Sequence, residues 1–220
     1  LGAGPIFLIF LEPDLGTAAM LFLVFASVIL FVGVRLRALA GLTLFGLFLL
    51  PFSWWFLKPH QQARILVLIN PEADPLGTGY NIIQSMVAIG SGRFFGRGYG
   101  RGIQAHLRYL PAPHTDFSFS VFAEEWGLLG VIIVLGLILF IIISGIGIAR
   151  QSRDRFGAIV AMGVVSLIFW HSFVNIAMSA GIFPIIGVPL PFISFGGSFL
   201  LTIMVGIGLL ESISMRRFIF

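Results

Sequence analysis

The stretch WGLLGVIIVLGLILFIIISGIGIA, Trp126–Ala149, contains no charged residue and is long enough to cross a lipid bilayer as an α-helix. A helix that spans a bilayer needs about 20 predominantly apolar residues. Four more uncharged runs of comparable length are Leu15–Val34, Ala38–Leu57, Phe156–Phe183 and Phe192–Leu210. A shorter apolar stretch, Ala3–Leu11, has about half the length of a span. Together these runs predict an all-α fold, a polytopic bundle of transmembrane helices.

The composition agrees with a lipid environment. Of the 220 residues, 58% are hydrophobic and 10% are charged, whereas soluble globular domains carry roughly 25% charged residues. Cysteine is absent, which excludes structural disulfides and cysteine-based metal or nucleophilic chemistry. The net charge of +4 would suggest a nucleic-acid partner in a soluble protein, but here the basic residues cluster beside apolar runs. The sequence therefore predicts an integral membrane protein in contact with membrane lipids, with no nucleic-acid partner.

Short basic connections orient the predicted spans. The basic residues of these connections are Arg35 and Arg37, then Arg150, Arg153 and Arg155, and finally Arg216 and Arg217. Successive crossings place all three groups on one side, which the positive-inside rule makes cytoplasmic. The connections Lys58–Glu125 and Pro184–Pro191 then face outward. The basic residues of the first do not contradict this orientation, because loops of about 60 residues translocate largely regardless of charge.

The large extracytoplasmic loop, residues 58–125, is where we expect the chemistry. Loops longer than about 15 residues are uncommon in compact domains and are often functional. Three apolar patches in it, Ile65–Leu68, Ile82–Ile89 and Phe117–Phe122, predict short helices that lie on the outer membrane face.

The segment Gly90–Gly102, GSGRFFGRGYGRG, is rich in glycine and arginine. It has two interpretations. In the first, flexible backbone amides and Arg93, Arg97 and Arg101 cradle the phosphates of an anionic lipid-linked substrate. In the second, it is a basic loop that rests on anionic lipid headgroups. A dinucleotide-binding fold would need a preceding strand, and the pattern indicates none.

The segment Leu110–Gly127, LPAPHTDFSFSVFAEEWG, places Asp116 where an apolar helix begins. Thr115 or Asp116 could simply cap that helix. The functional alternative is that Asp116, held at the membrane surface, acts as a general base. A metal site formed by His114, Asp116 and Glu124 matches no strong ligand spacing, so no metal is predicted.

Further polar residues lie next to the predicted spans. Glu124 and Glu125 directly precede the interfacial Trp126, and carboxylates at that depth are functional candidates. The Pro- and Gly-rich segment Gly187–Ser198 predicts a helix break that lines an enclosed cavity at membrane depth. His171 and Asn175, one helical turn apart, are expected to be interhelical hydrogen-bond partners rather than ligands.

Five motifs, in this order, resemble the SEDS family of membrane proteins. They are EPDLGTA (Glu12–Ala18), RILVLINPEADPLGTGYNIIQS (Arg64–Ser85), AIGSG (Ala88–Gly92), LPAPHTDFSFSVFAEEWG (Leu110–Gly127) and GVPLPFISFGGS (Gly187–Ser198). Within the family, the run DPLGTGYN followed by AIGSG and Gly102–Gln104 resembles the rod-shape-determining (RodA-like) branch more than the division branch. The pattern departs from the family at Ser118, where members usually carry Ile.

The resemblance implies a peptidoglycan glycosyltransferase that polymerises lipid II into glycan strands during cell elongation, at the outer face of the bacterial cytoplasmic membrane. Asp116 corresponds to the family's essential carboxylate. The implied partners are lipid II, the growing glycan strand and a class B penicillin-binding protein that supplies transpeptidation. This chain corresponds to the C-terminal half of the family plan, and its start at Leu1 suggests that it begins inside a helix. The resemblance implies that this half alone is inactive.

The implied reaction is an inverting glycosyl transfer without a covalent intermediate. Asp116 would take the proton of the acceptor sugar's hydroxyl, and the leaving undecaprenyl pyrophosphate would need cationic partners. Gln84, Glu124 and Glu125 are further candidates for contacts with the substrate. The cationic candidates are Arg64, Arg93, Arg97 and Arg101.

Two other functions fit the same residues. A lipid II flippase would share the broken helices and the polar cavity, and a non-enzymatic scaffold of the elongation machinery would share the membrane bundle. An outward-facing carboxylate suits polymerisation, whereas transport would require groups along a path through both leaflets. No cofactor is expected, and no pattern in the sequence assigns a divalent cation.

Overall fold

The computed structural model describes residues 15–33, 41, 59–74, 77–102 and 115–216. Their elements are helical throughout, with no strand among them, so the prediction of an all-α fold is confirmed. In chain order the elements are α2 (Leu15–Val32), α4 (Pro59–Ile69), the 3-10 helix η1 (Pro71–Ala73), α5 (Thr78–Ser91), α7 (Ser118–Gln151), α8 (Arg155–Ser179) and α9 (Gly197–Arg216).

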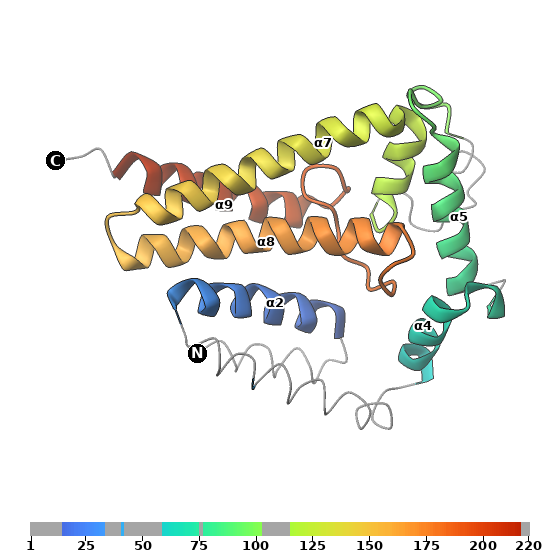
Figure 1. Cartoon of the computed structure of the whole chain (residues 1–220), viewed down its shortest axis with the longest axis horizontal. Coiled ribbons are helices and arrows are strands. Elements are labelled where there is room, and N and C mark those ends of the chain that lie inside the picture. The colour runs from blue at the N-terminus through green and yellow to red at the C-terminus, as the bar shows by residue number, and fades with distance from the viewer. Residues whose placement is uncertain (1–14, 34–40, 42–58, 75–76, 103–114, 217–220) are drawn as a thin grey trace.

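Three helices of the described ranges, α7, α8 and α9, are long and apolar enough to cross a membrane. α8 lies between α2 and α7 and also contacts α9 (Figure 1). The core between these helices is built from Ile138 of α7, Ile168 of α8 and Ile203 of α9, each buried. Many large apolar side chains on the outer faces of the helices are exposed, which suits a hydrocarbon solvent better than water. The apolar runs therefore fold as a bundle whose surface is suited to lipid.

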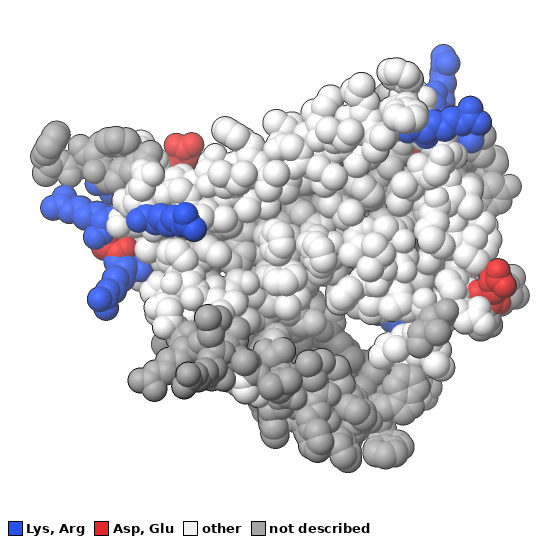
Figure 2. Space-filling view, viewed as in Figure 1, with Lys and Arg blue, Asp and Glu red and all other residues white. Residues whose placement is uncertain are grey.

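The packing of α2 fixes which helix ends lie together. Near its start, Met20 packs against Val174 in the last turns of α8. Near its end, Phe31 packs against the cluster that contains Ala161 of α8 and Leu210 of α9. The end of α2, the α7–α8 turn and the end of α9 thus lie at one end of the bundle, which agrees with the side assigned to the short basic connections. In Figure 2 the basic side chains of the described residues gather toward the two ends of the molecule.

The end of α8 corrects the expected span Phe156–Phe183. The helix ends at Ser179 because Gly181 adopts a positive φ of 71°. The backbone amide of Ile182 then donates to the carbonyl of Ala177 at 2.8 Å, as in a Schellman motif, which closes a helix at a left-handed glycine.

The start of α9 corrects the expected span Phe192–Leu210. Residues 191–194 form a turn in which the amides of Ile193 and Ser194 donate to the carbonyl of Leu190. The helix therefore begins only at Gly197 and continues to Arg216. The expected stretches Ala3–Leu11 and Ala38–Leu57 lie outside the described residues.

The connection of residues 58–125, predicted to face outward and called the outer connection below, contains helices at its apolar patches, of which only the first two lie in short helices. The first patch lies in α4, the second in α5, and the third forms the beginning of α7. Asp74 orders the start of α5, because its carboxylate accepts from the amide of Thr78 at 2.8 Å and its carbonyl accepts from the amide of Tyr80. α5 then packs against α7 (Figure 1). The outer connection thereby places its chemistry beside the start of α7.

Candidate functional site

Asp116 lies directly before the cap of α7. The N-cap residue is Phe117, whose side chain makes no capping hydrogen bond. The interpretation of Asp116 as a capping residue is therefore wrong. Its half-buried side chain lies beside Gly187, so that a methyl group added to this glycine would lie 3.6 Å from Oδ2. Among the described residues, no side chain donates a hydrogen bond to the Asp116 carboxylate.

Asn175 of α8 holds the backbone of Asp116. Its Nδ2 donates to the carbonyl of Asp116 at 3.1 Å and to the carbonyl of Val188 at 2.6 Å. The amide is fully buried. Nδ1 of His171 lies 3.4 Å from the carbonyl of Pro189. Both residues make hydrogen bonds as predicted, but not between helices, because the carbonyls that they contact lie in the irregular segments before α7 and before α9.

Ser194 is a second anchor for the start of α7. Its hydroxyl accepts from the amide of Leu190 at 2.7 Å and donates to the carbonyl of Thr115 at 2.8 Å. The hydroxyl of Ser118 lies 2.5 Å from that of Ser194. The segment Gly187–Ser198 thus contacts residues 115–118. It is not enclosed as expected, because Val188, Leu190 and Pro191 are buried while Phe192, Phe195 and Gly197 are exposed.

α7 is broken at Gly127. This residue has φ 64° and ψ −167°, and it separates a first arm, Ser118–Trp126, from the long second arm, 128–151. The break interrupts the helical bonding pattern, because the amides of Leu128 and Leu129 would otherwise donate to carbonyls four residues earlier. They donate instead to the carbonyls of Arg93 and Phe94, at 2.8 and 3.1 Å.

The glycine-rich loop also donates hydrogen bonds to backbone carbonyls of α7 that precede the break. The amide of Arg97 donates to the carbonyl of Glu124, and that of Gly98 to the carbonyl of Glu125, both at 3.0 Å. A side chain on Gly96 would collide with the carbonyl of Glu125, and one on Gly127 with the backbone nitrogen of Gly96. The loop therefore stabilises the broken helix, because it forms hydrogen bonds with the backbone groups that the break leaves unpaired.

This arrangement bears on the phosphate-cradle interpretation of the loop. The amides of Arg97 and Gly98 are bound to carbonyls of α7, and that of Gly100 donates to Oε1 of Glu125 at 3.0 Å. These three amides cannot also bind a phosphate. What the loop offers an anion is the side chains of its arginines, which are exposed.

The two predicted carboxylates have different surroundings. Glu124 is 0% exposed, and its Oε1 lies 3.3 Å from the hydroxyl of Ser91 and 3.9 Å from Nε of Arg97. Glu125 is half-buried and borders a pocket. Glu124 thus contacts the glycine-rich loop from the buried side, while Glu125 lines the pocket.

The predicted cationic residues are only partly brought together. Arg93 and Arg97 line a depression of about 680 Å³, bordered by Val87 and Gly90 at the end of α5. Arg64 on α4 and Arg101 in the loop are exposed but do not line this depression, and neither does the half-buried Gln84 of α5.

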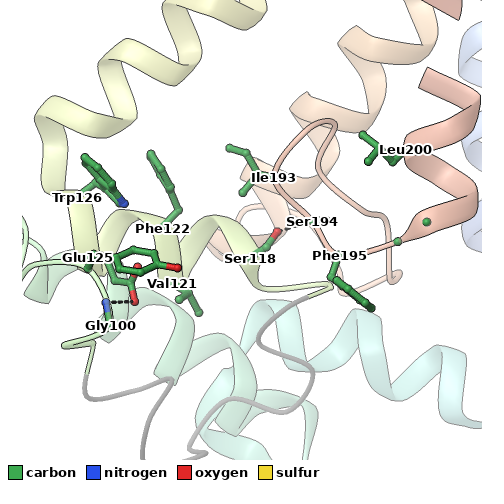
Figure 3. Close-up of a pocket in the computed structure, with 13 residues that line it drawn as sticks. Gly100, Ser118, Val121, Phe122, Glu125, Trp126, Ile193, Ser194, Phe195 and Leu200 are labelled. Carbon is green, nitrogen blue, oxygen red and sulfur yellow. Dashed lines mark hydrogen bonds between the residues drawn. The ribbon is translucent and has the colours of Figure 1, made fainter. Parts of the chain in front are cut away.

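A larger pocket, of about 820 Å³, lies between the first arm of α7 and the segment that leads into α9. The sequence predicts a cavity lined by Gly187–Ser198, but not that the first arm of α7 forms its other wall. Figure 3 shows Phe122, Glu125 and Trp126 on one side of it and Phe195 and Leu200 on the other, with Ser118 and Ser194 between them. Two of its walls come from segments about 75 residues apart in the chain, 118–126 and 193–200. No spacing in the sequence predicts that these segments lie side by side. The signal available in the sequence was the presence of aromatic residues close to polar ones, as at Phe122, Glu125 and Trp126.

The structure does not test the metal set considered from the sequence; within the described ranges no group of three His, Asp or Glu side chains is close enough to bind an ion. His114 of that set lies outside them.

A family model described as "Cell cycle protein", which covers FtsW, RodA and SpoVE, matches residues 3–218. The peptidoglycan glycosyltransferase MrdB of Escherichia coli K12 is 42% identical over 214 residues, which cover 97% of this chain and 58% of MrdB. The peptidoglycan glycosyltransferase RodA of Treponema pallidum is 48% identical over 161 residues, 73% of this chain and 37% of that protein. The matched part of the chain therefore covers 58% of the length of MrdB and 37% of that of the Treponema RodA.

Two solved structures share the fold. One is from work on the structural coordination of polymerization and crosslinking by a peptidoglycan synthase complex. It matches with a TM-score of 0.78 and 31% identity, over 99% of this chain and 60% of the other. The second is a mutant of the rod shape determining protein RodA from Thermus thermophilus, with a TM-score of 0.63 and 25% identity, over 98% of this chain and 54% of the other.

Proposed function

This chain belongs to the FtsW, RodA and SpoVE family, on its RodA-like side, and we propose that the protein it forms is a peptidoglycan glycosyltransferase that polymerises lipid II. The resemblance drawn from the motifs is confirmed by the family model and by the curated relatives. It is a membrane protein, and we place it in the bacterial cytoplasmic membrane with the outer connection facing outward.

The observation that carries this proposal is the way Asp116 is held. The carbonyls on either side of it along the chain, its own and that of Thr115, are bound by Asn175 of α8 and Ser194 of the segment before α9. Two parts of the bundle therefore fix the backbone at this residue, yet its carboxylate meets no donor among the residues the structure describes. A carboxylate whose backbone is fixed and whose oxygens accept no hydrogen bond from the described residues suits a general base.

In the proposed reaction, Asp116 accepts the proton of the acceptor sugar's 4-hydroxyl as that oxygen attacks the anomeric carbon of the lipid-linked donor. The bond from this carbon to the pyrophosphate oxygen breaks, and undecaprenyl pyrophosphate leaves with the bonding electron pair. The anomeric centre is inverted in the single displacement. Charge that develops on the leaving group is stabilised by guanidinium groups.

Arg93 and Arg97 are the best-placed candidates for the pyrophosphate, because they line one depression. Arg64 and Arg101 are exposed on the same outer connection and would supply longer-range attraction for the anionic donor. Gln84 would hydrogen-bond a sugar of the substrate.

A class B penicillin-binding protein is the proposed partner. The support is that one similar structure comes from a peptidoglycan synthase complex that couples polymerization and crosslinking. The partner would crosslink the strand that this protein extends.

The test is polymer synthesis from purified lipid II by the full-length protein together with its penicillin-binding partner. We expect glycan chains and released undecaprenyl pyrophosphate, resolved by gel electrophoresis. A parallel assay in vesicles measures lipid II movement between leaflets. Movement without polymer would contradict the proposal and favour a flippase, and neither activity in an intact complex would favour a scaffold.

A further inference from the structure

The pocket of Figure 3 differs in character from the depression that holds Arg93 and Arg97. Its volume of about 820 Å³ lies in the range of small-molecule sites, roughly 300–1,000 Å³. None of its described lining residues is Lys or Arg, and its titratable groups are Glu125 and the phenol of Tyr99. Such a pocket disfavours a phosphate and admits a neutral, hydroxyl-rich ligand.

One wall of the pocket is aromatic. The rings of Phe122 and Trp126, one turn apart on the first arm of α7, lie 6.1 Å apart and nearly parallel, at 15°. Trp126 is 51% exposed. Across the pocket stands Phe195. Flat apolar faces of this kind pack against the C–H face of a pyranose ring, while an indole N–H can donate to a hydroxyl.

The polar groups of the pocket are placed to bind hydroxyls. Oε1 of Glu125 accepts from the amide of Gly100 at 3.0 Å, which fixes the carboxylate and leaves acceptor capacity on it. Ser194 donates its proton to the carbonyl of Thr115, so the hydroxyl of Ser118 must donate to Ser194 and keeps its own lone pairs for a ligand.

From these observations we infer that the pocket is a saccharide subsite, which binds a pyranose unit of the glycan strand between the Phe122–Trp126 wall and Phe195. This inference rests on the proposed function and adds a location to it. Ser118 at the pocket floor is two residues from Asp116, and Ser194 binds the carbonyl next to it. A sugar held here would lie on the same scaffold that fixes the base, while the Arg93–Arg97 depression lies elsewhere, at the end of α5.

The experiment uses the full-length protein in nanodiscs of neutral phosphatidylcholine and chitotetraose, a β-1,4-linked N-acetylglucosamine tetramer, as the probe. Binding is followed by saturation-transfer NMR and by calorimetric titration. The variants are Trp126→Ala, Phe195→Ala and Glu125→Gln. The matched control is Phe95→Ala, because Phe95 is 83% exposed on the neighbouring loop and does not line the pocket.

We expect each pocket variant that keeps the wild-type unfolding temperature to bind chitotetraose at least about tenfold more weakly, as for the loss of one stacking surface or charge-assisted hydrogen bond. Phe95→Ala should bind like wild type. The conservative Trp126→Phe should restore most of the affinity, because it keeps a ring in place. Two folded pocket variants that bind normally would overturn the inference.

Two further outcomes also decide it. Wild-type protein that polymerises lipid II but binds no chitotetraose would contradict the subsite while sparing the proposed function. Loss of chitotetraose binding when the phosphatidylcholine of the nanodiscs is replaced by phosphatidylethanolamine would assign the pocket to lipid headgroups. That result would also contradict the saccharide subsite. Conversely, Asp116→Asn should bind chitotetraose normally. If that variant also polymerised normally, the proposed role of Asp116 would fail and the subsite would stand.

Discussion

Asn175 shows how much of the site depends on one side chain. A single amide nitrogen binds two carbonyls, those of Asp116 and Val188, that are far apart in the sequence. Asn175 itself is fully buried. The geometry of the proposed base is thus set by a residue that does not touch substrate.

We predict that Asn175→Ala lowers the free energy of unfolding by about 1–3 kcal/mol, the cost of stranding buried carbonyls. Polymerisation should fall as well, because Asp116 loses its anchor. Thermal unfolding in detergent measures the first effect. The control is Ser166→Ala on the same helix. The hydroxyl of Ser166 is buried without a partner among the described residues, so its removal should be neutral or stabilising. A destabilisation by Ser166→Ala equal to that of Asn175→Ala would argue against the anchor.

At this scale the sequence located the carboxylate but not its supports. Asp116 stands out because it directly precedes an apolar stretch, whereas the choice between cap and base depends on which residue begins the helix. That residue is Phe117, one position beyond what the motif suggests. The support from Ser194 was out of reach, since its partners are 76 and 79 residues away along the chain.

Among the elements, the broken α7 is the feature that organises the outer end. Its break depends on a glycine at positive φ and on a loop that supplies four backbone hydrogen bonds. The apolar runs predicted which segments form long helices, because the length of an apolar run can be read directly from the local sequence. They could not predict the break, which exists only because a distant loop satisfies the freed backbone groups.

Gly127→Ala should therefore destabilise the protein, because the added Cβ would be strained at φ 64° and would collide with the loop backbone. We expect a loss of at least about 1–3 kcal/mol, typical of backbone strain, seen as a lower unfolding temperature. Gly136→Ala is the matched control on the second arm, where an added Cβ meets nothing within 4 Å. It should be neutral or stabilising by up to about 1 kcal/mol. Equal unfolding temperatures of the two variants would contradict the claim that the glycine-rich loop stabilises the break at Gly127.

The glycine-rich loop carries a second prediction, for binding rather than folding. Arg93→Gln combined with Arg97→Gln should raise the KM for lipid II by about tenfold or more, because charge-assisted bonds to the pyrophosphate are lost. Arg150→Gln combined with Arg155→Gln removes the same charge at the other end of the bundle and should leave KM unchanged. Steady-state kinetics in detergent at fixed ionic strength compares them. An unchanged KM in the first pair would return the loop to the headgroup-binding interpretation.

For the whole molecule, the two ends of the bundle have different tasks. One end gathers the α7–α8 turn and the ends of α2 and α9, and the other gathers Asp116, the glycine-rich loop and the pocket. The short basic connections were sufficient to distinguish these two ends, because the positions of their Arg residues can be read directly from the sequence.

The orientation is tested with single cysteines, for which the lack of native cysteine in this chain is an advantage. In a cysteine-free full-length background, Tyr99→Cys should react with a membrane-impermeant maleimide added to intact cells. Arg153→Cys should react only after the membrane is permeabilised. Labelling in the reverse order would invert the topology and place Asp116 on the wrong side for the proposed reaction.

The central claim, that Asp116 is the base of a glycosyl transfer, is tested most directly by Asp116→Asn in the full-length protein. Asn has nearly the same shape, and the carbonyl of residue 116 can still bind Asn175, so folding and association with the penicillin-binding partner should persist. It cannot accept a proton as a base, so polymer formation from purified lipid II should fall at least about 10²-fold. Near-normal glycan synthesis by a folded, partner-bound Asp116→Asn protein would contradict the account.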